Sequence, residues 1–534
     1  MKRILVLVSY MFLSTFALAK ELIISETTPS FFALYEQNRQ EQVPNYVTLD
    51  FILTSTYLFK QQSITKMEEE EMIGLFQELA LGLKENLLKD YSPEKKEALA
   101  YVLVLNELLD INSTDAPKDA LTLAEKELKL IKKHEGIVSS PIAKVKMDYT
   151  QFKVRAKYTK NAKLSSYFLA LKYMSYMPFM VNAHSAIGVT ETVATEQMQN
   201  TLYLVKTLKP LSKLYKQIEE KLRVLSGEGD DLAIAVLKDE HNTSTAVQAY
   251  VNSLERYPKI NERIIDTTQI KAEDIPKATL ALKLLPSRFS PDGYIFSKLT
   301  YPYVGQVKRK KDKLTSFIDG KNVRGYPTVM DISAVLVNKL PAESKYENYS
   351  QQVESLKKDM NLILDNIYAY DFAIYKQLLE DNKTNSFKGY YTQSKYIMNL
   401  YQKQSYTGGL KGMFLDNRTE AFLENNISKV LDLVIQELKL FPKSETFSML
   451  IEKVKELDTK TQPYDKEEIQ FLNNLDMKFK HLLDSADTPI KVDIHTNPVE
   501  EKVMYESLGE PFVKIKGKGR GAVYNHREFI SERK

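Results

Sequence analysis

The segment VDIHTNP near the end of the sequence brings together two residue types that bind metals and move protons. Asp493 and His495 are two positions apart on a predicted β-strand, so their side chains should lie on one face of it. Such a pair could supply two of three metal ligands, or the carboxylate could orient the imidazole. The alternative is a hydrogen bond that satisfies both groups at a partly buried strand end. We favour this structural interpretation, because metal ligation needs a third and usually a fourth donor.

Two further residues could complete a site with this pair. His526 lies in the same C-terminal stretch, and Glu528 follows two positions later. If the strands that carry these residues pair, Asp493, His495, His526 and Glu528 could converge on one ion. The sequence has no cysteine and only 6 histidines. We therefore predict no metal and no other cofactor, with a metal site at Asp493, His495 and His526 as the alternative.

Two adjacent carboxylates, Asp230 and Asp231, lie where the pattern predicts the start of a helix. Paired carboxylates can share a proton or hold a cation. They are also the residues that a helix start favours, as a cap and as partners of the helix dipole. Capping is the favoured interpretation.

A third polar group surrounds a stretch rich in proline, glycine and tyrosine. Arg288 and Asp292 flank its start, and Asp331 lies beyond. In a loop packed on helices, an arginine usually anchors backbone carbonyls or a carboxylate. A cleft lined with Arg, Asp and Tyr would instead suit a sugar or a peptide. The tyrosines that could line it are Tyr294, Tyr301, Tyr303 and Tyr326. Half-buried packing is the favoured alternative for them.

The other charged runs do not indicate a function, and several classes of enzyme are excluded because their motifs are absent. KRKKDK (308–313) is typical of a solvated loop, and MEEEEM (67–72) fits the first turns of a helix, where glutamate favours the positive end of the dipole. The sequence contains no GxSxG, HExxH, Walker A or GxGxxG motif, and the lack of cysteine excludes a thiol nucleophile. An acid–base mechanism would have to use Asp230, Asp231, Asp292, Asp331 or Glu528, and no pair among them stands out.

The elements that must position these residues are mainly helical. Apolar residues recur every three or four positions over residues 72–87, 117–134, 161–180, 193–225, 231–256, 351–380, 418–440 and 466–484. Ser92-Pro93 predicts another helix start. The fold class is therefore mainly α, a large assembly of paired helices with a long structured loop region and a small C-terminal β module. The predicted units are a helical domain over 20–484, with the irregular region at 284–346, and a β module over 485–534.

The N-terminus predicts export. A basic start precedes an apolar run at 4–16, and Ala17-Leu18-Ala19 gives small residues at a cleavage site, so we expect a signal peptide over 1–19 that is cut after Ala19. No later segment is apolar enough to cross a bilayer. The net charge of +4 does not indicate nucleic-acid binding. The mature protein is predicted to be periplasmic or secreted and to fold without disulfides.

Eight blocks follow one another along the chain: VPNYVTLDFIL (43–53), DYTQFKVRAKYT (148–159), SGEGDDL (226–232), RFSPDGYIF (288–296), GYPTVMDISAVL (325–336), LYQKQSYTG (400–408), VDIHTNP and RGAVYNHREF. Together they resemble a secreted bacterial family, domain-of-unknown-function family 3160. The resemblance implies a shared fold and shared positions, but no activity.

The chain departs from this family where the family carries histidine and tryptophan. The residues after Asp50 lack the family's two histidines, Lys157 stands in place of a histidine, and YIMN (396–399) replaces Arg-His-Asp-Thr. If relatives use those groups to bind a metal or move protons, this chain lacks them. We therefore expect a non-catalytic binding or scaffold protein for an envelope glycan, peptide or protein, and lean against an enzyme. The alternative is a hydrolase or lyase that acts on an envelope polysaccharide through acidic residues.

Overall fold

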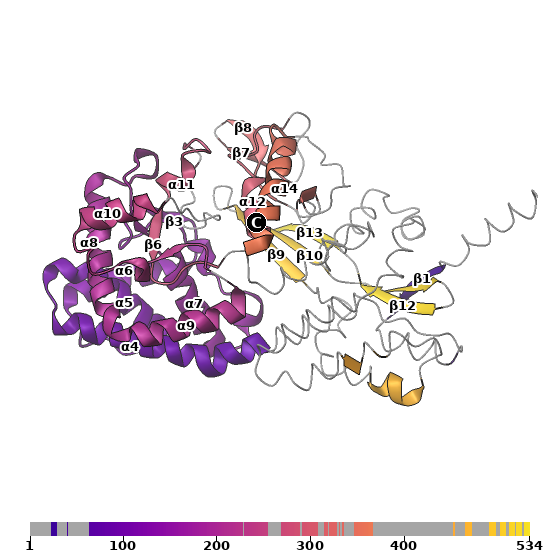
Figure 1. Ribbon diagram of the computed structural model, residues 1–534, viewed down its shortest axis with the longest axis horizontal. Coiled ribbons are helices and arrows are strands. Elements are labelled where there is room, and N and C mark those ends of the chain that lie inside the picture. Colours follow the sequence, from indigo (N-terminus) through magenta and orange to yellow (C-terminus); the bar gives the residue numbers. More distant parts are fainter. Residues whose placement is uncertain are drawn as a thin grey trace, which may run out of the picture.

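The computed structural model describes most of residues 63–366 and several shorter segments (Figure 1). The described residues are 23–28, 40, 63–227, 229–254, 267, 269–288, 291–307, 314–318, 320–327, 331, 334–335, 346–366, 452–453, 456, 465–471, 491–497, 502–508, 512–517, 520–525 and 528–533. Predictions for 1–19, for Asp50, for 308–313 and for 367–451 lie outside them. The described part is mainly helical with a few small sheets, as the sequence predicts.

A bundle of helices forms the main body, on the left of Figure 1. It consists of α4 (Ile73–Lys89), α5 (Lys96–Leu108), α6 (Lys118–Lys133), α7 (Ala162–Tyr176), α8 (Glu191–Leu208), α9 (Ser212–Ser226) and α10 (Ser244–Ser253). The predicted apolar stripe of the first helix is confirmed, since Phe76, Leu79 and Leu83 are fully buried. Burial of such stripes removes apolar surface from water and drives the helices together.

Helices α5 and α6 run parallel. Tyr91, just before α5, contacts Asp119 at the start of α6 at 2.9 Å, whereas Glu107 near the end of α5 contacts Lys132 near the end of α6 at 3.4 Å. The chain must return along the pair between these helices, through residues 109–117. As a result, both helices begin at the same end of the bundle.

The helix predicted over 231–256 is present only in its second half. The first part of this range forms the strand β5 (Leu232–Ala233) and a short 3₁₀ turn, and α10 follows. Thr243 caps α10, because its Oγ1 accepts a hydrogen bond from Ala246 N at 3.1 Å. β5 pairs in parallel with β6 (Ala281–Lys283), which also pairs with β4 (Phe179–Met180). Tertiary pairing has overridden the local helical pattern here.

The region 284–346, predicted to be irregular, carries elements of its own where it is described. It contains α12 (Pro291–Lys298) and the hairpin of β7 (Thr315–Ile318) and β8 (Lys321–Arg324). With α14 (Tyr349–Asn366) it builds a second apolar cluster separate from the main core. Its buried members are Tyr294, Ile295, Leu299, Val304, Ala334, Val335, Tyr346, Tyr349, Val353, Leu356 and Met360.

The predicted C-terminal strands are present and form two sheets. β10 (Lys502–Leu508) lies between β9 (Lys491–Asn497) and β13 (Glu528–Arg533). In the other sheet β11 (Phe512–Gly517) lies between β12 (Arg520–Asn525) and β1 (Ile23–Thr28). The strand β1, near the N-terminus, is thus part of a sheet whose strands were all predicted to come from residues 485–534. Within the described ranges, no helix combines the length and the apolar character needed to span a bilayer.

Candidate functional site

Asp493 and His495 lie on β9, the predicted strand, in register with β10. Asp493 pairs with Glu506 and His495 pairs with Met504. Glu528 starts β13 on the other side of β10, opposite Leu508. β9 and β13 are therefore separated by one strand, about 10 Å between backbones, rather than paired directly. His526 lies outside the described residues.

Asp230 and Asp231 do not begin a helix, so the capping prediction is wrong. They precede β5, and both are buried. The Asp231 carboxylate forms an ion pair with Lys283 at the end of β6, and both side chains are fully buried. The ammonium group of Lys283 also donates to Ser287 Oγ, which in turn donates to the carbonyl oxygen of Ser175 at 2.9 Å. A buried lysine needs a counter-charge, and this need explains the position of Asp231.

Two of the blocks that carry the family resemblance meet beside this ion pair. Gly229 forms a β-bridge with Arg288, and the Arg288 guanidinium donates to the carbonyl oxygen of Gly227 at 3.3 Å. The chains approach so closely that a Cβ atom on Gly229 would lie 2.7 Å from Pro286. Arg288 thus anchors a backbone carbonyl, one of the roles that the sequence predicts, and joins 226–232 to 288–296.

Asp331 holds the second core together. Arg324 Nη2 donates to both Asp331 oxygens at 2.9 Å, and the Tyr349 hydroxyl donates to Oδ1 at 2.6 Å. Arg324 also donates to the carbonyl oxygen of Leu299 at 2.5 Å. The carboxylate is therefore engaged by groups from β8 and α14.

The tyrosines of this region mostly pack. Tyr294 and Tyr326 are buried, and Tyr301 and Tyr303 are half-buried. Tyr294 donates to Asp359 at 3.0 Å, and burial, together with this carboxylate, raises the pKa of Tyr294. Asp292 lies in α12, but its side chain is outside the described part of the protein.

The glutamate run MEEEEM forms a cross-link that sequence reasoning missed. Glu68–Met72 is a π-helix inside a longer helical stretch. Glu68 is buried and pairs with Lys157 at 2.6 Å, while Glu71 pairs with Lys221 at 2.5 Å and Glu69 accepts a hydrogen bond from Asn161. Lys157, where the resemblance expects a histidine, therefore serves an ion pair. Burial raises the pKa of Glu68 and lowers that of Lys157, against the attraction of the pair. Only the unusual density of glutamate signals this role in the sequence.

A second missed group lies at Glu127, on the inner face of α6. Its carboxylate accepts hydrogen bonds from Tyr149 Oη at 2.5 Å and from Ser140 Oγ at 2.7 Å. Both partners flank the hairpin of β2 (Ile137–Ser139) and β3 (Lys146–Asp148), which α6 therefore holds in place. Burial raises the pKa of Glu127 even though these hydrogen bonds lower it.

Glu127 should make the stability of the protein depend on pH. The raised pKa means that the native state binds this proton more tightly than the unfolded chain does. Its contribution is fully present below the ordinary glutamate pKa and is lost as the pH rises through the raised one. We expect the free energy of unfolding of the wild type, relative to Glu127→Gln, to fall as the pH rises above the ordinary glutamate pKa. Urea denaturation at each pH measures the difference, and the exposed Glu125 on α6 supplies the control, Glu125→Gln. If the difference in free energy of unfolding between the wild type and Glu127→Gln does not change with pH, burial does not raise the pKa of Glu127.

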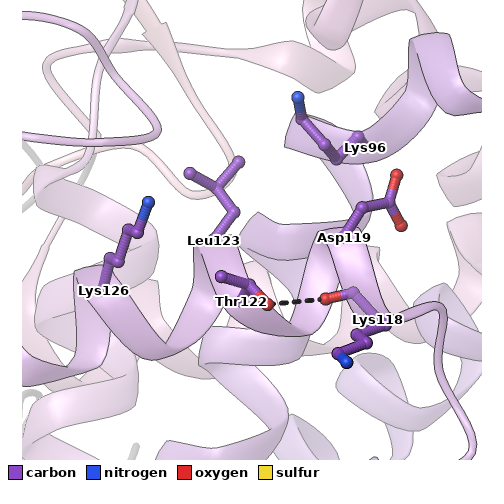
Figure 2. Close-up of a pocket in the computed structure, with 6 residues that line it drawn as sticks. All are labelled: Lys96, Lys118, Asp119, Thr122, Leu123 and Lys126. Carbon is purple, nitrogen blue, oxygen red and sulfur yellow. Dashed lines mark hydrogen bonds between the residues drawn. The ribbon is translucent and has the colours of Figure 1, made fainter.

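One surface feature that can receive a ligand is a hollow of about 530 Å³ over α5 and α6 (Figure 2). We call it the lysine hollow, and its lining residues are Lys96, Lys118, Asp119, Thr122, Leu123 and Lys126. None of these residues stands out by type in the sequence. Positions 118, 122 and 126 repeat at the helical spacing, which is the signal that could have found one side of the hollow.

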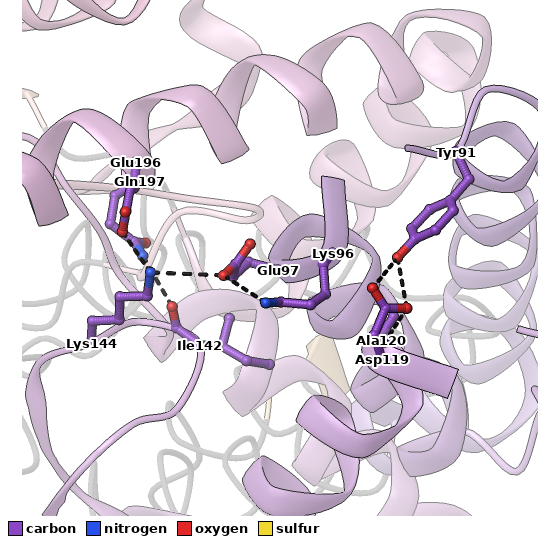
Figure 3. A network of polar contacts seen from close by, with 9 residues as sticks. All are labelled: Tyr91, Lys96, Glu97, Asp119, Ala120, Ile142, Lys144, Glu196 and Gln197. Atoms are coloured by element: carbon purple, nitrogen blue, oxygen red, sulfur yellow. Dashed lines mark hydrogen bonds and ion pairs between the residues drawn. The ribbon is translucent and has the colours of Figure 1, made fainter. Parts of the chain in front are cut away.

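A polar network fixes the acidic residue of the lysine hollow (Figure 3). Both Asp119 oxygens accept hydrogen bonds from Tyr91 at 2.9 Å, and Oδ1 also accepts from Ala120 N. Burial, and then this contact with Asp119, raise the pKa of Tyr91 to about 12, so its hydroxyl remains a donor. Beside the hollow, Glu97 contacts both Lys96 and Lys144 at 3.7 Å. The arrangement can hold a negatively charged group, and none of its described contacts resembles an acid–base pair.

These features define a mainly helical protein with internal ion pairs and a basic surface hollow. The chain belongs to a family of proteins of unknown function, DUF3160, whose sequence profile matches residues 15–534. No curated protein and no solved structure matches the chain. Where side chains are described, no three His, Asp and Glu residues gather in a group that could hold a metal ion.

Proposed function

We propose that the protein is exported to the cell envelope and acts there as a non-catalytic binding or scaffold protein for an envelope glycan, peptide or protein. The basic start, the apolar run at 4–16 and Ala17-Leu18-Ala19 support export. The helical body would then be the scaffold that presents a ligand-binding surface.

The state of two of the five candidate acids, Asp231 and Asp331, is the observation that carries the proposal. Asp231 is committed to Lys283, and Asp331 to Arg324 and Tyr349, with all these groups buried. A general acid or base must reach the substrate and change its protonation during the reaction. A carboxylate that neutralises a buried cation is poorly placed for that task, because its protonation would leave the cation unpaired.

The test is a paired binding and turnover assay with residues 20–534. Isothermal titration against purified envelope polymers of the host should give saturable binding to at least one polymer. The same polymers should show no new reducing or unsaturated ends after prolonged incubation. Turnover that disappears in the Asp231→Asn or Asp331→Asn variant, with folding intact by circular dichroism, would overturn the proposal in favour of a hydrolase or lyase. Binding to none of the polymers would overturn it as well.

A further inference from the structure

The lysine hollow presents more positive than negative charge. Lys118 and Lys126 are exposed on α6, and Lys96 lines the hollow from the start of α5. In Figure 2 the side chains of Lys96 and Lys126 extend on either side of Leu123. Asp119, the acidic residue of the lining, is engaged by Tyr91 and the Ala120 amide, and Glu97 beside the hollow pairs with Lys96 at 3.7 Å. These two carboxylates offset the three lysines only in part.

The backbone adds to this positive potential. α5 begins at Lys96 and α6 begins at Lys118, and the two helices run parallel, so the positive ends of both dipoles lie at the hollow. Pro117 at the cap position of α6 offers no capping side chain, and Asp119 in the first turn, which accepts from Ala120 N, offsets this potential in part. The hollow thus combines two independent sources of attraction for anions, lysine side chains and helix ends.

We propose that the lysine hollow binds an acidic glycan of the envelope, an extended polymer that carries carboxylate or phosphate groups at intervals. This inference rests on the proposed binding function and names its ligand class. Lys118 and Lys126 are eight residues apart on α6, which corresponds to about 12 Å along the helix. One small anion cannot contact both ends of such a row, whereas a polymer with repeated charges can.

The chemistry of the hollow favours a glycan over other polyanions. A stable protein interface needs an apolar centre with large anchoring side chains, and Leu123 is the sole apolar residue of the lining. A bilayer surface is bound by helices that insert several large apolar side chains, and the lysine hollow presents a concave surface with one half-buried leucine. The hydroxyl of Thr122 and the ammonium groups suit the hydroxyls and acid groups of a sugar chain.

A charge-reversal experiment tests the ligand class. The Lys118→Glu/Lys126→Glu variant is compared with Lys163→Glu/Lys213→Glu, which changes the net charge equally at exposed lysines on α7 and α9 outside the hollow. The probes are size-graded oligogalacturonates, neutral dextran, phosphatidylglycerol vesicles and polyglutamate, measured by titration at low and moderate salt. We expect wild-type affinity to rise with oligogalacturonate length, to fall with salt, and to drop about tenfold or more in the hollow variant only.

The outcomes separate this inference from the proposed function. If both double variants still bind oligogalacturonate, the lysine hollow is not the binding site, and the proposed binding function is unaffected. Preference for vesicles or polyglutamate over oligogalacturonate overturns the glycan assignment. Wild-type binding to neutral polymers alone also overturns the inference but supports a binding protein, whereas binding to none of the probes or host polymers overturns both.

Discussion

Asp231→Ala is expected to lower the free energy of unfolding by about 3–5 kcal/mol, because it leaves the ammonium group of Lys283 in the interior without its counter-charge. Both side chains are fully buried in the native protein. Ser287 remains as a hydrogen-bond partner for Lys283, but a hydroxyl does not neutralise a charge. Urea denaturation at neutral pH measures the loss. The loss should shrink at high pH, where the lysine can deprotonate and burying it costs less.

A double replacement distinguishes the ion pair from simple damage to the core. Asp231→Leu with Lys283→Met removes both charges and keeps apolar volume, so it should recover most of the stability that Asp231→Ala loses. The surface pair Lys209–Asp239, at 2.7 Å and largely exposed, supplies the control. Asp239→Ala should cost less than about 1 kcal/mol. If the double replacement lowers the free energy of unfolding by the sum of the losses at Asp231 and at Lys283, the ion pair between them does not stabilise the protein.

The helices that the sequence predicted correctly are those whose pattern is complete within one segment. α4, α6 and α7 each bury one regular face, and α6 follows its predicted range of 117–134 within a residue at each end. The partly wrong prediction at 231–256 has a different cause. Leu232 and Ala233 pair with Leu282 and Lys283, about fifty positions later, and local periodicity carries no information about that pairing.

The same limit explains why the polar partners were missed. Glu68 meets Lys157, and Asp231 meets Lys283, across long stretches of chain. The residue types were conspicuous in the sequence, but their partners follow only from the packing of helices and strands. The lysine hollow is an intermediate case. The spacing of its residues on α6 can be read from the sequence. That Lys96 also lines the hollow follows only from the parallel packing of α5 against α6.

A division of roles follows for the charged residues. Asp231, Arg288 and Asp331 suggested a functional site in the sequence, and their side chains are described. In the structure they join segments inside the protein. The lysines of α6, which looked ordinary, are exposed around a hollow. Burial decides between the two roles, because a buried charge must be matched within the fold while an exposed one can exchange water for a ligand.

Asp331→Ala is expected to destabilise the second core by about 3–5 kcal/mol, because it leaves the buried guanidinium of Arg324 without its carboxylate. The effect should concentrate in residues 284–366, where Arg324, Asp331 and Tyr349 link β8 to α14. Limited proteolysis with mass spectrometry would show faster cleavage there, while the α4–α10 bundle stays protected. Tyr349→Phe is the matched control: it removes one hydrogen bond, keeps the ion pair and should cost about 1 kcal/mol. A loss in Asp331→Ala no greater than in Tyr349→Phe would show that the ion pair contributes nothing beyond that hydrogen bond. Uniform cleavage of bundle and second core would show instead that the two clusters unfold as one unit.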